Sequence, residues 1–273
     1  MSVLDSTLGQ ATDYPVRYTP SLLFPITRRE GRDAIGLTGD CLPFHGVDIW
    51  THYEVSWLDA GGKPCVAVAE IRVPATSPCL IESKSLKLYF NSLNFHRFES
   101  SADFLRCVEM DLGAAAQALV TVGLVLPHEH EQLAIGDLNG ECLDGLPLQC
   151  SEFVLNPETL VADEGRVVEE TLHSHLLRSN CPVTNQPDWG SVMIHYRGAA
   201  IDHTGLLAYL VSYRSHADFH EQCVERIFMD ITRRCRPESL TVYARYTRRG
   251  GLDINPFRSS AQVLPPLLRL FRQ

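Results

Sequence analysis

The feature that most constrains the fold of this chain is an internal repeat. Leu206–Ser212 (LLAYLVS) matches Leu86–Ser92 (LKLYFNS), and Cys223–Glu225 on a following helix matches Cys107–Glu109. A chain whose two halves repeat one pattern folds as two similar supersecondary units. The repeat therefore predicts an α+β protein with two antiparallel β ribbons, each accompanied by paired helices.

Strand signals are clear in the first half. Residues 47–57 alternate apolar and polar side chains, residues 59–63 (DAGGK) have the composition of a turn, and residues 64–74 complete a predicted hairpin. Residues 1–46 carry four prolines, so we expect an extended arm with little regular structure there.

Each half also contains a helix with an apolar stripe. The first is expected to be capped by Ser101, with Phe104, Cys107, Val108 and Leu112 on one face. The second is predicted over residues 215–236, with a buried stripe formed by Phe219, Cys223, Ile227, Phe228 and Ile231. His220 and Glu221 lie in its first turns, where side chains can project past the helix end; a solvated His-Glu pair is the alternative.

Residues 173–189 (HSHLLRSNCPVTNQPDW) carry the clearest chemistry. Pro182 and Pro187 argue against helix or central strand, so we expect an irregular loop of fixed shape that presents Cys181 and Asp188. Covalent catalysis needs such a pair, because a thiolate attacks an electrophilic carbon while a nearby acid handles the proton. The alternative is that Cys181 is a small buried hydrophobe.

The two halves differ where this chemistry is expected. Cys41 and Asp48 repeat the thiol-to-carboxyl spacing, but their half lacks the His-Glu pair, so we reject them as a second site. Only the first half carries Glu82–Lys84, and complementary loss after duplication predicts one site assembled from both halves. We expect an arm at 1–46, a first module with the Glu-Ser-Lys segment at 47–126, a connection at 127–170, and a second module with Cys181 at 171–273.

Composition restricts the class of protein. A net charge of −9 argues against general nucleic-acid binding, which needs concentrated Lys and Arg. No apolar run approaches the ~20 residues that span a bilayer, and the N-terminus lacks the order of a secretory signal. Nine cysteines without a Cys-x-x-Cys pair fit a reducing compartment. We therefore expect a cytoplasmic protein that binds neither membrane nor nucleic acid.

Most of the basic residues are arginines. Lys63, Lys84 and Lys87 are the only lysines, and two of them lie three residues apart, which suits a point charge against a phosphate; chance clustering is the alternative. Arg249 beside paired glycines suits an anion-binding turn, with an ordinary hairpin turn as the alternative. A Gly-x-Gly-x-x-Gly motif is absent, so the residues by themselves do not indicate a nicotinamide cofactor.

We expect no metal ion. His128 and His130 are a close pair, as are His173 and His175, but the sequence shows no matching Cys or acidic set at ligand spacing. Solvated or structural histidines are the commoner explanation of such pairs.

Four segments together resemble the NADPH-dependent 7-cyano-7-deazaguanine reductases, the nitrile reductases of the QueF family, in their long duplicated form. They are Glu82–Tyr89 (ESKSLKLY), Cys181–Trp189 (CPVTNQPDW), Phe219–Val224 (FHEQCV) and Arg249–Ile254 (RGGLDI). The resemblance covers nearly the whole chain. It implies tandem tunnelling-fold (T-fold) modules, antiparallel β ribbons backed by helix pairs, with a barrel completed by oligomerisation. A duplicated chain needs fewer copies to close such a barrel, so we expect a homodimer.

The same resemblance implies an activity, which is reduction of the nitrile of 7-cyano-7-deazaguanine to a primary amine by two NADPH, on the route to queuosine in transfer RNA. Cys181 would add to the nitrile carbon and form a covalent thioimide. Asp188 would protonate the nitrogen, and His220 would line the site and assist a proton transfer.

The resemblance also implies the binding residues. The substrate would contact Ile81, Glu82, Ser83, His220 and Glu221, and NADPH would contact Ser83, Lys84, Arg249 and Gly250. The two carboxylates suit the N–H donors of the deazaguanine edge, because an ionised carboxylate only accepts hydrogen bonds.

Two other functions stay open at this point. GTP cyclohydrolases share the tunnelling fold, so a cyclohydrolase-like pterin enzyme is one alternative, and it would require a zinc site that the sequence does not reveal. A non-catalytic purine-binding protein with a structural Cys181 is the other.

Overall fold

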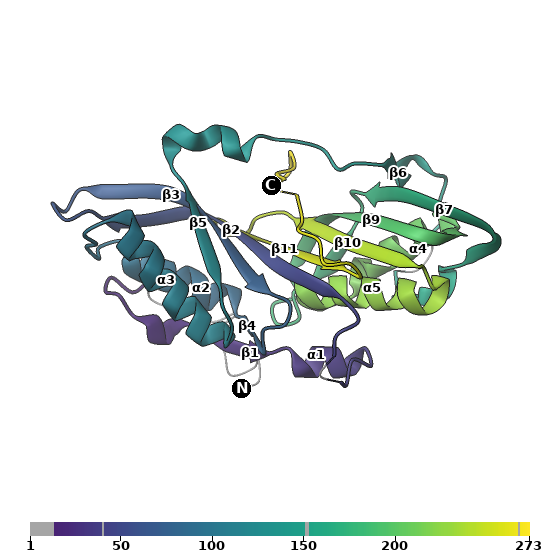
Figure 1. The fold of residues 1–273 in the computed structure, drawn as a ribbon, viewed down its shortest axis with the longest axis horizontal. Coiled ribbons are helices and arrows are strands. Elements are labelled where there is room, and N and C mark those ends of the chain that lie inside the picture. The colour runs from purple at the N-terminus through teal and green to yellow at the C-terminus, as the bar shows by residue number, and fades with distance from the viewer. Residues whose placement is uncertain (1–13, 40, 151–152, 267) are drawn as a thin grey trace. The chain divides into compact units, whose positions relative to one another are not determined.

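The computed structural model describes residues 14–39, 41–150, 153–266 and 268–273 (Figure 1). It forms two compact units. The first comprises residues up to Gly31, Asp48–Ala134 and Arg248–Ile254, and the second comprises Arg32–Val47, Ile135–Thr247 and Asn255–Gln273. These boundaries come from packing and differ from the module boundaries expected from the sequence, which stay predictions.

The first unit contains the predicted hairpin. Its strands are β2 (His45–Leu58), β3 (Pro64–Pro74) and β5 (Thr121–Val125), in the order β5-β3-β2. The turn between β2 and β3 is closed by two backbone bonds, from Asp59 N–H to Lys63 O and from Gly62 N–H to Asp59 O, both 2.9 Å. Both predicted strands are therefore confirmed, and the second has the predicted bounds.

Helices α2 (Ser83–Leu93) and α3 (Ser101–Ala116) cover one face of this ribbon (Figure 1). Phe104, Val108 and Leu112 on α3 are fully buried, as the apolar stripe predicted. The Phe104 ring stacks on Trp57 of β2 with 4.5 Å between ring centroids. The predicted cap was one residue late, because the Ser100 hydroxyl, not that of Ser101, accepts the Asp103 N–H at 3.2 Å.

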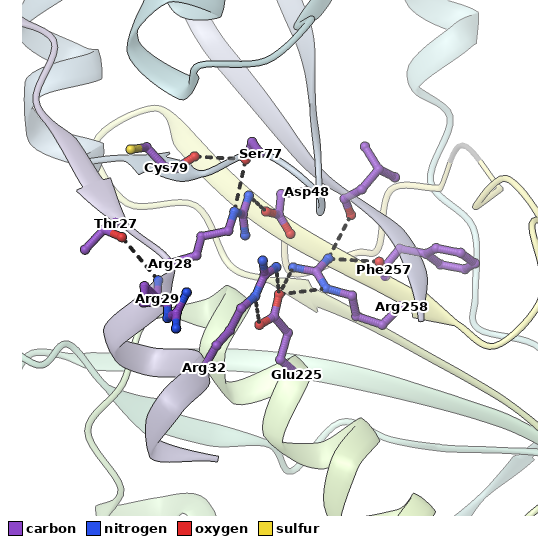
Figure 2. Close-up of polar contacts among 11 residues, drawn as sticks. Thr27, Arg28, Arg29, Arg32, Asp48, Ser77, Cys79, Glu225, Phe257 and Arg258 are labelled. Atoms are coloured by element: carbon purple, nitrogen blue, oxygen red, sulfur yellow. Dashed lines mark hydrogen bonds and ion pairs between the residues drawn. The ribbon is translucent and has the colours of Figure 1, made fainter. Parts of the chain in front are cut away.

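The prediction of an arm with little regular structure is wrong for the described part of residues 1–46. A 3₁₀ turn covers Pro20–Leu22, β1 covers Pro25–Thr27 and pairs with β4 (Cys79–Ile81), and α1 covers Arg29–Ala34. The cause is a buried side chain that the proline pattern does not reveal. Arg28 donates to Asp48 at 2.5 Å and to the Ser77 hydroxyl at 3.0 Å, so this segment is tied to the first unit (Figure 2).

The second unit has a larger antiparallel sheet. Its strand order is β11-β10-β9-β7-β6, with β8 added beside β9. Strand β6 pairs with β7 in parallel, whereas β10–β11, β9–β10, β7–β9 and β8–β9 are antiparallel. The bounds are β6 Glu141–Cys142, β7 Ala162–Ser174, β8 Arg178–Asn180, β9 Pro187–Ile201, β10 Ser239–Tyr246 and β11 Leu252–Ser259. The expected connection at 127–170 thus contains β6, much of β7, and 3₁₀ turns at Pro127–Leu133, Leu143–Gly145 and Pro157–Thr159.

Helices α4 (His203–Ser212) and α5 (His220–Cys235) pack on one face of that sheet (Figure 1). The helix predicted to begin at residue 215 begins five residues later. Residues 213–215 form a separate 3₁₀ turn, and Phe219 has an extended backbone at the α5 N-cap. This later start puts His220 and Glu221 in the first turn of the helix, as expected.

The structure confirms the repeat but corrects its alignment in the second helix. Tyr89 on α2 donates to Asp111 on α3 at 2.7 Å, and Tyr209 on α4 donates to Asp230 on α5 at the same distance. Both second helices have 16 residues and end at a left-handed residue, Gln117 or Arg236. Cys223 therefore occupies the position of Phe104, three residues from the match with Cys107 that the sequence suggested.

The mixed α+β class with antiparallel sheets is confirmed, while the tandem tunnelling fold and a barrel completed by oligomerisation stay predictions. Among the described residues, none of the helices is long and apolar enough to cross a membrane.

One buried carboxylate organises the charged interior of the second unit. Glu225 on α5 accepts two bonds from Arg32, at 2.8 and 2.9 Å, and two from Arg258 on β11, at 2.8 and 3.1 Å (Figure 2). The Arg258 side chain is completely buried, and Glu225 is 3% exposed. Because removing one partner of a buried ion pair is costly, this carboxylate contributes to the stability of both guanidinium groups.

We predict that Glu225→Ala lowers the free energy of unfolding by about 3–5 kcal/mol, the usual cost of leaving a buried partner charge uncompensated. Urea denaturation followed by circular dichroism measures this change. The control is Lys63→Ala, which removes an 80% exposed side chain from its pair with Asp59 and should scarcely alter the midpoint. Equal midpoints for Glu225→Ala and the wild type would contradict the assignment.

Candidate active site

Cys181 lies at the tip of the β8–β9 hairpin. Its N–H donates to Gln186 O at 2.9 Å, and its carbonyl accepts the Asn185 N–H at 3.0 Å, so residues 181–186 form a closed turn. Asn185 adopts the left-handed conformation that this turn requires, with φ of 54°. The irregular loop expected over residues 173–189 is therefore shorter, because residues 178–180 and 187–189 are paired strands.

The hairpin register places the thiol and the carboxyl group on the same face. Ser179 on β8 pairs directly with Asp188 on β9. Cys181 follows Ser179 by two residues and comes directly after the end of β8, so strand alternation predicts its side chain on the face of Ser179 and Asp188. Cys181 is 5% and Asp188 4% exposed. Diagonal neighbours across antiparallel strands are about 7 Å apart, which leaves room for a small substrate group between them.

His220 completes this group of side chains. Its Nε2 lies 3.4 Å from Asp188 Oδ1, and its ring stacks on Tyr246 at 3.8 Å between centroids with an angle of 6° between planes. The stacking holds the imidazole in one orientation toward the carboxyl group. Tyr246, the last residue of β10, was not singled out from the sequence, because its residue type alone gives no functional signal.

The start of α5 is fixed to the same hairpin. The Asn180 N–H donates to His216 O at 2.8 Å, and the Asp218 N–H donates to Asn180 O at 3.1 Å. These bonds run along the segment that leads into His220, so the hairpin and the first turn of α5 are positioned together. Glu221, the next residue of the helix, is 3% exposed. The second unit therefore contains four predicted site residues, Cys181, Asp188, His220 and Glu221, and brings two of them, Asp188 and His220, into contact.

A second cysteine, Cys223, lies one helical turn after His220, and its environment excludes it as the nucleophile. It is fully buried, and burial raises the pKa of its thiol well above the ordinary value. A thiol with a raised pKa stays protonated near neutral pH and is a poor nucleophile. Cys181 is thus the better placed thiol of this unit.

The rejected pair is excluded by geometry as well. Asp48 is completely buried and bonded by Arg28, whereas Cys41 is exposed. Asp48 also lies on β2, the first strand of its ribbon, whereas Asp188 follows the long connection that leaves β7.

The other predicted residues, Ile81, Glu82, Ser83 and Lys84, lie in the first unit at the junction of β4 and α2. Glu82 caps the helix, because its carboxylate accepts the Lys84 N–H at 2.6 Å and the Ser85 N–H at 2.8 Å. Glu82 is 1% exposed, and its capping role was not foreseen. Oε1 also accepts the Ser83 hydroxyl at 3.5 Å, whereas Oε2 keeps a second lone pair for another donor.

Arg249 and Gly250 belong to a tight turn in the same unit, closed by the Arg249 N–H to Leu252 O bond at 2.9 Å. Gly250 and Gly251 have φ of 57° and 71°. A Cβ on Gly251 would lie 2.4 Å from the Glu54 side chain, and one on Gly250 would lie 3.4 Å from Lys87 Nζ. Glycine is therefore required at 251, and the turn lies beside the ammonium group of Lys87.

Two groups of β2 hold this turn. The Gly251 carbonyl accepts the Tyr53 N–H at 2.8 Å and lies 3.0 Å from His52 Nδ1. The second contact is a hydrogen bond when Nδ1 carries the proton. Burial lowers the pKa of His52 below its ordinary value of 6.5. The neutral Nδ1–H imidazole therefore suits this position.

The prediction of no metal ion assumed that the histidine pairs have no matching cysteine, and this assumption is wrong for one pair. His173 and His175 do have a cysteine neighbour, because Cys142 on β6 lies beside them, and the ligand atoms of the three residues lie within 4.8 Å of one another. The sequence could not reveal this cluster, since about 30 residues without ligand spacing separate Cys142 from the histidines.

We predict that His52 makes stability fall in mildly acidic solution. The unfolded chain takes up a proton below about pH 6.5 while the buried imidazole resists it, so the free energy of unfolding falls by up to about 1.4 kcal/mol per pH unit. In His52→Asn, whose amide can still donate to Gly251, that slope disappears. Urea titrations between pH 5 and 7.5 measure it, with the exposed His130→Asn as control. Parallel profiles for His52→Asn and the wild type would refute this prediction.

Two models of known protein families match parts of this chain. A family model described as "Nitrile reductase, 7-cyano-7-deazaguanine-reductase N-term" matches residues 14–124, and one described as "QueF-like protein" matches residues 187–263. Among solved structures, the apo form of the archaeosine synthase QueF-Like is similar at 20% identity and a TM-score of 0.31, over 36% of this chain and 96% of that one. That weak likeness supports no argument. The two family matches span most of both halves, and the chain belongs to the QueF family of nitrile reductases.

Proposed function

We propose that the protein reduces the nitrile of 7-cyano-7-deazaguanine to the 7-aminomethyl amine, with two NADPH and a covalent thioimide on Cys181, in queuosine biosynthesis. Membership in the nitrile reductase family supports the reaction class. The observation that carries the assignment of residues is the shared buried face of Cys181 and Asp188 in one hairpin, with His220 at 3.4 Å from the carboxyl group.

The chemistry of a nitrile explains why this arrangement is needed. A nitrile carbon is a weak electrophile, so a thiolate must attack it while an acid protonates the nitrogen that gains the electron pair. The C–S bond forms as one C–N π bond breaks, and the proton comes from Asp188. His220, which stacks on Tyr246 and lies 3.4 Å from Asp188, would return a proton to that carboxyl group.

NADPH supplies the hydride for each of the two reductions. After the first, the carbon–sulfur bond breaks, the Cys181 thiolate leaves, and the substrate becomes an imine. The second reduction needs no bond to the protein, so Cys181 acts once in each turnover, whereas proton supply is needed at every stage.

Recognition of the heterocycle is assigned to two buried carboxylates, Glu82 and Glu221, together with Ile81, Ser83 and His220. The deazaguanine edge presents N–H donors, and a carboxylate that is already fixed loses little freedom on accepting them. Glu82 is fixed by its two bonds to the start of α2. Glu221 is fixed in the first turn of α5.

The NADPH phosphates are assigned to Lys84, Arg249, Gly250 and the Ser83 hydroxyl. Lys87 Nζ, which lies beside Gly250, adds positive charge next to this turn. The residues present thus fit a phosphate-bearing cosubstrate.

Two alternatives are kept. A cyclohydrolase-like enzyme would place a metal next to the reacting atom, but Cys142, His173 and His175 lie on the sheet face opposite Asp188, because Asp188 and Ser191 of β9 are an odd number of residues apart and Ser191 contacts His175. A purine-binding protein would bind the heterocycle without covalent chemistry.

We predict a mass increase equal to 7-cyano-7-deazaguanine when the protein is mixed with this nitrile in the absence of NADPH. Intact-protein mass spectrometry should find it in the wild type and not in Cys181→Ala. Cys223→Ala is the matched control and should keep the adduct, because burial keeps that thiol protonated. Absence of an adduct in folded wild type that still binds the heterocycle by calorimetry would favour the purine-binding protein.

We predict that Asp188→Asn lowers kcat by about 10²–10⁴-fold while the dissociation constant for the nitrile changes little, because an amide keeps the shape but not the proton. Steady-state oxidation of NADPH and calorimetry measure the two quantities. The control is Glu170→Gln, whose carboxylate also pairs with a histidine, His203, at 3.2 Å and has no proposed role in catalysis. Wild-type turnover in Asp188→Asn would reject Asp188 as the acid.

A further inference from the structure

Cys142, His173 and His175 form the one group of metal-ligating side chains found among the described residues, and the proposed reaction does not use it. One potential ligand atom from each residue lies within 4.8 Å of the other two. Cys142 is exposed, whereas His173 is 9% exposed and His175 is partly buried. The site is thus open to solvent on the cysteine side.

The topology of the second unit builds this cluster. Strand β6 runs parallel to β7, and their register places Cys142 directly beside His173. His175 follows His173 by two residues and so lies on the same face. The approach requires a glycine, because a Cβ on Gly140 would lie 2.0 Å from the Thr171 carbonyl oxygen. Gly140 has φ of 91°, which favours glycine independently.

The second ring nitrogens are already bonded in the manner of metal-binding histidines. His173 Nδ1 lies 3.1 Å from Asn139 O, and His175 Nδ1 lies 2.8 Å from the Ser191 hydroxyl. Such outer bonds fix the tautomer of a ligating imidazole and direct its other nitrogen to the metal. In both residues Nε2 is therefore the nitrogen available for coordination.

We propose that Cys142, His173 and His175 bind one Zn²⁺ ion. A donor set of one thiolate and two imidazoles binds zinc in preference to the hard cations Mg²⁺ and Ca²⁺. Tetrahedral zinc needs ligand atoms about 3.3–3.6 Å apart, as follows from Zn–N and Zn–S bond lengths, so the exposed Cys142 side chain has to move by roughly 1 Å. Binding releases the thiol proton of Cys142.

The fourth position is left to solvent. Asp144, the nearest acidic candidate, is already used, because it accepts the Ser174 hydroxyl at 2.6 Å and the His175 N–H at 3.1 Å. A site with three protein ligands holds zinc less firmly than a closed four-cysteine site, so chelators should remove the ion.

The ion would fasten β6 to the edge of β7 and stabilise the strand that leads toward β8. It does not reach the proposed reaction, since its ligands and Asp188 lie on opposite faces of the sheet. The expected role is therefore structural, and the inference does not depend on the nitrile reduction proposed above.

The test uses untagged full-length protein, stripped with a chelator and dialysed against Zn²⁺. Elemental analysis should find about one zinc per chain in the wild type, and Cys142→Ser and His173→Gln should each bind at least tenfold more weakly in a competition titration with a chromogenic chelator. Cobalt should give a thiolate charge-transfer band that Cys142→Ser lacks. Zinc at about 100 times its dissociation constant should raise the melting temperature by roughly 5–10 °C.

Matched controls are Cys150→Ser, which removes another exposed thiol, and His130→Gln, which removes an exposed imidazole. Both should bind zinc like the wild type. Equal zinc affinities in the wild type, Cys142→Ser and His173→Gln, all folded by circular dichroism, would overturn the proposal. Because the proposed ion has a structural role, zinc-free protein should still reduce the nitrile. Failure of the zinc proposal can therefore be distinguished from failure of the proposed function.

Discussion

The hydrogen bond between Tyr209 and Asp230 is the contact on which the second unit depends. It joins α4 to α5 inside the core at 2.7 Å, and burial raises the pKa of Tyr209 well above its ordinary value, so the phenol stays protonated and donates to the carboxylate. Once the two helices are in this register, the first turn of α5 is fixed, and with it His220. The first unit has the same bond between Tyr89 and Asp111, which shows that the duplicated element is the helix pair and its internal polar contact.

What differs between the units is the connection between the first two ribbon strands. In the first unit β2 and β3 are joined by the five-residue turn 59–63. In the second unit β7 and β9 are separated by residues 175–186, and this longer connection forms β8 and presents Cys181. The proposed nucleophile thus lies where the connection between two ribbon strands is longer, while both units keep the same bond between their paired helices.

The sequence predicted those features of the fold that leave a local pattern of residues. Alternation and turn composition are local, so the strand at 64–74 and the stripe of Phe104, Val108 and Leu112 were predicted well. Contacts between distant residues leave no local pattern. This is why the Arg28–Asp48 pair, which orders the expected arm, was missed, and why Cys142 was not connected with His173 and His175.

The candidate site shows the same division. Cys181, Asp188 and the His-Glu pair were predicted from residue type and the family resemblance, and their roles stay predictions, but the proline argument misassigned the backbone. Pro187 is the first residue of β9, where a strand tolerates proline, so Asp188 lies in a paired strand and not in a loop. That pairing is what gives Asp188 a defined partner in Ser179 and a defined face. Tyr246, by contrast, carries no signal until β10 is placed beside β9.

Strand β9 contributes to both the candidate active site and the Cys142–His173–His175 cluster, one on each of its faces. Asp188, Val192, Ile194 and Tyr196 face the helices, whereas Ser191 faces the other way and contacts His175. A slip of one residue would exchange the faces and remove Asp188 from His220. The register is held from the outer face, where the Arg272 guanidinium donates to His175 O, Gly190 O and the Ser191 hydroxyl. The contacts of Arg272 on one face of β9 thus help to fix which side chains of the strand reach the face of the candidate site.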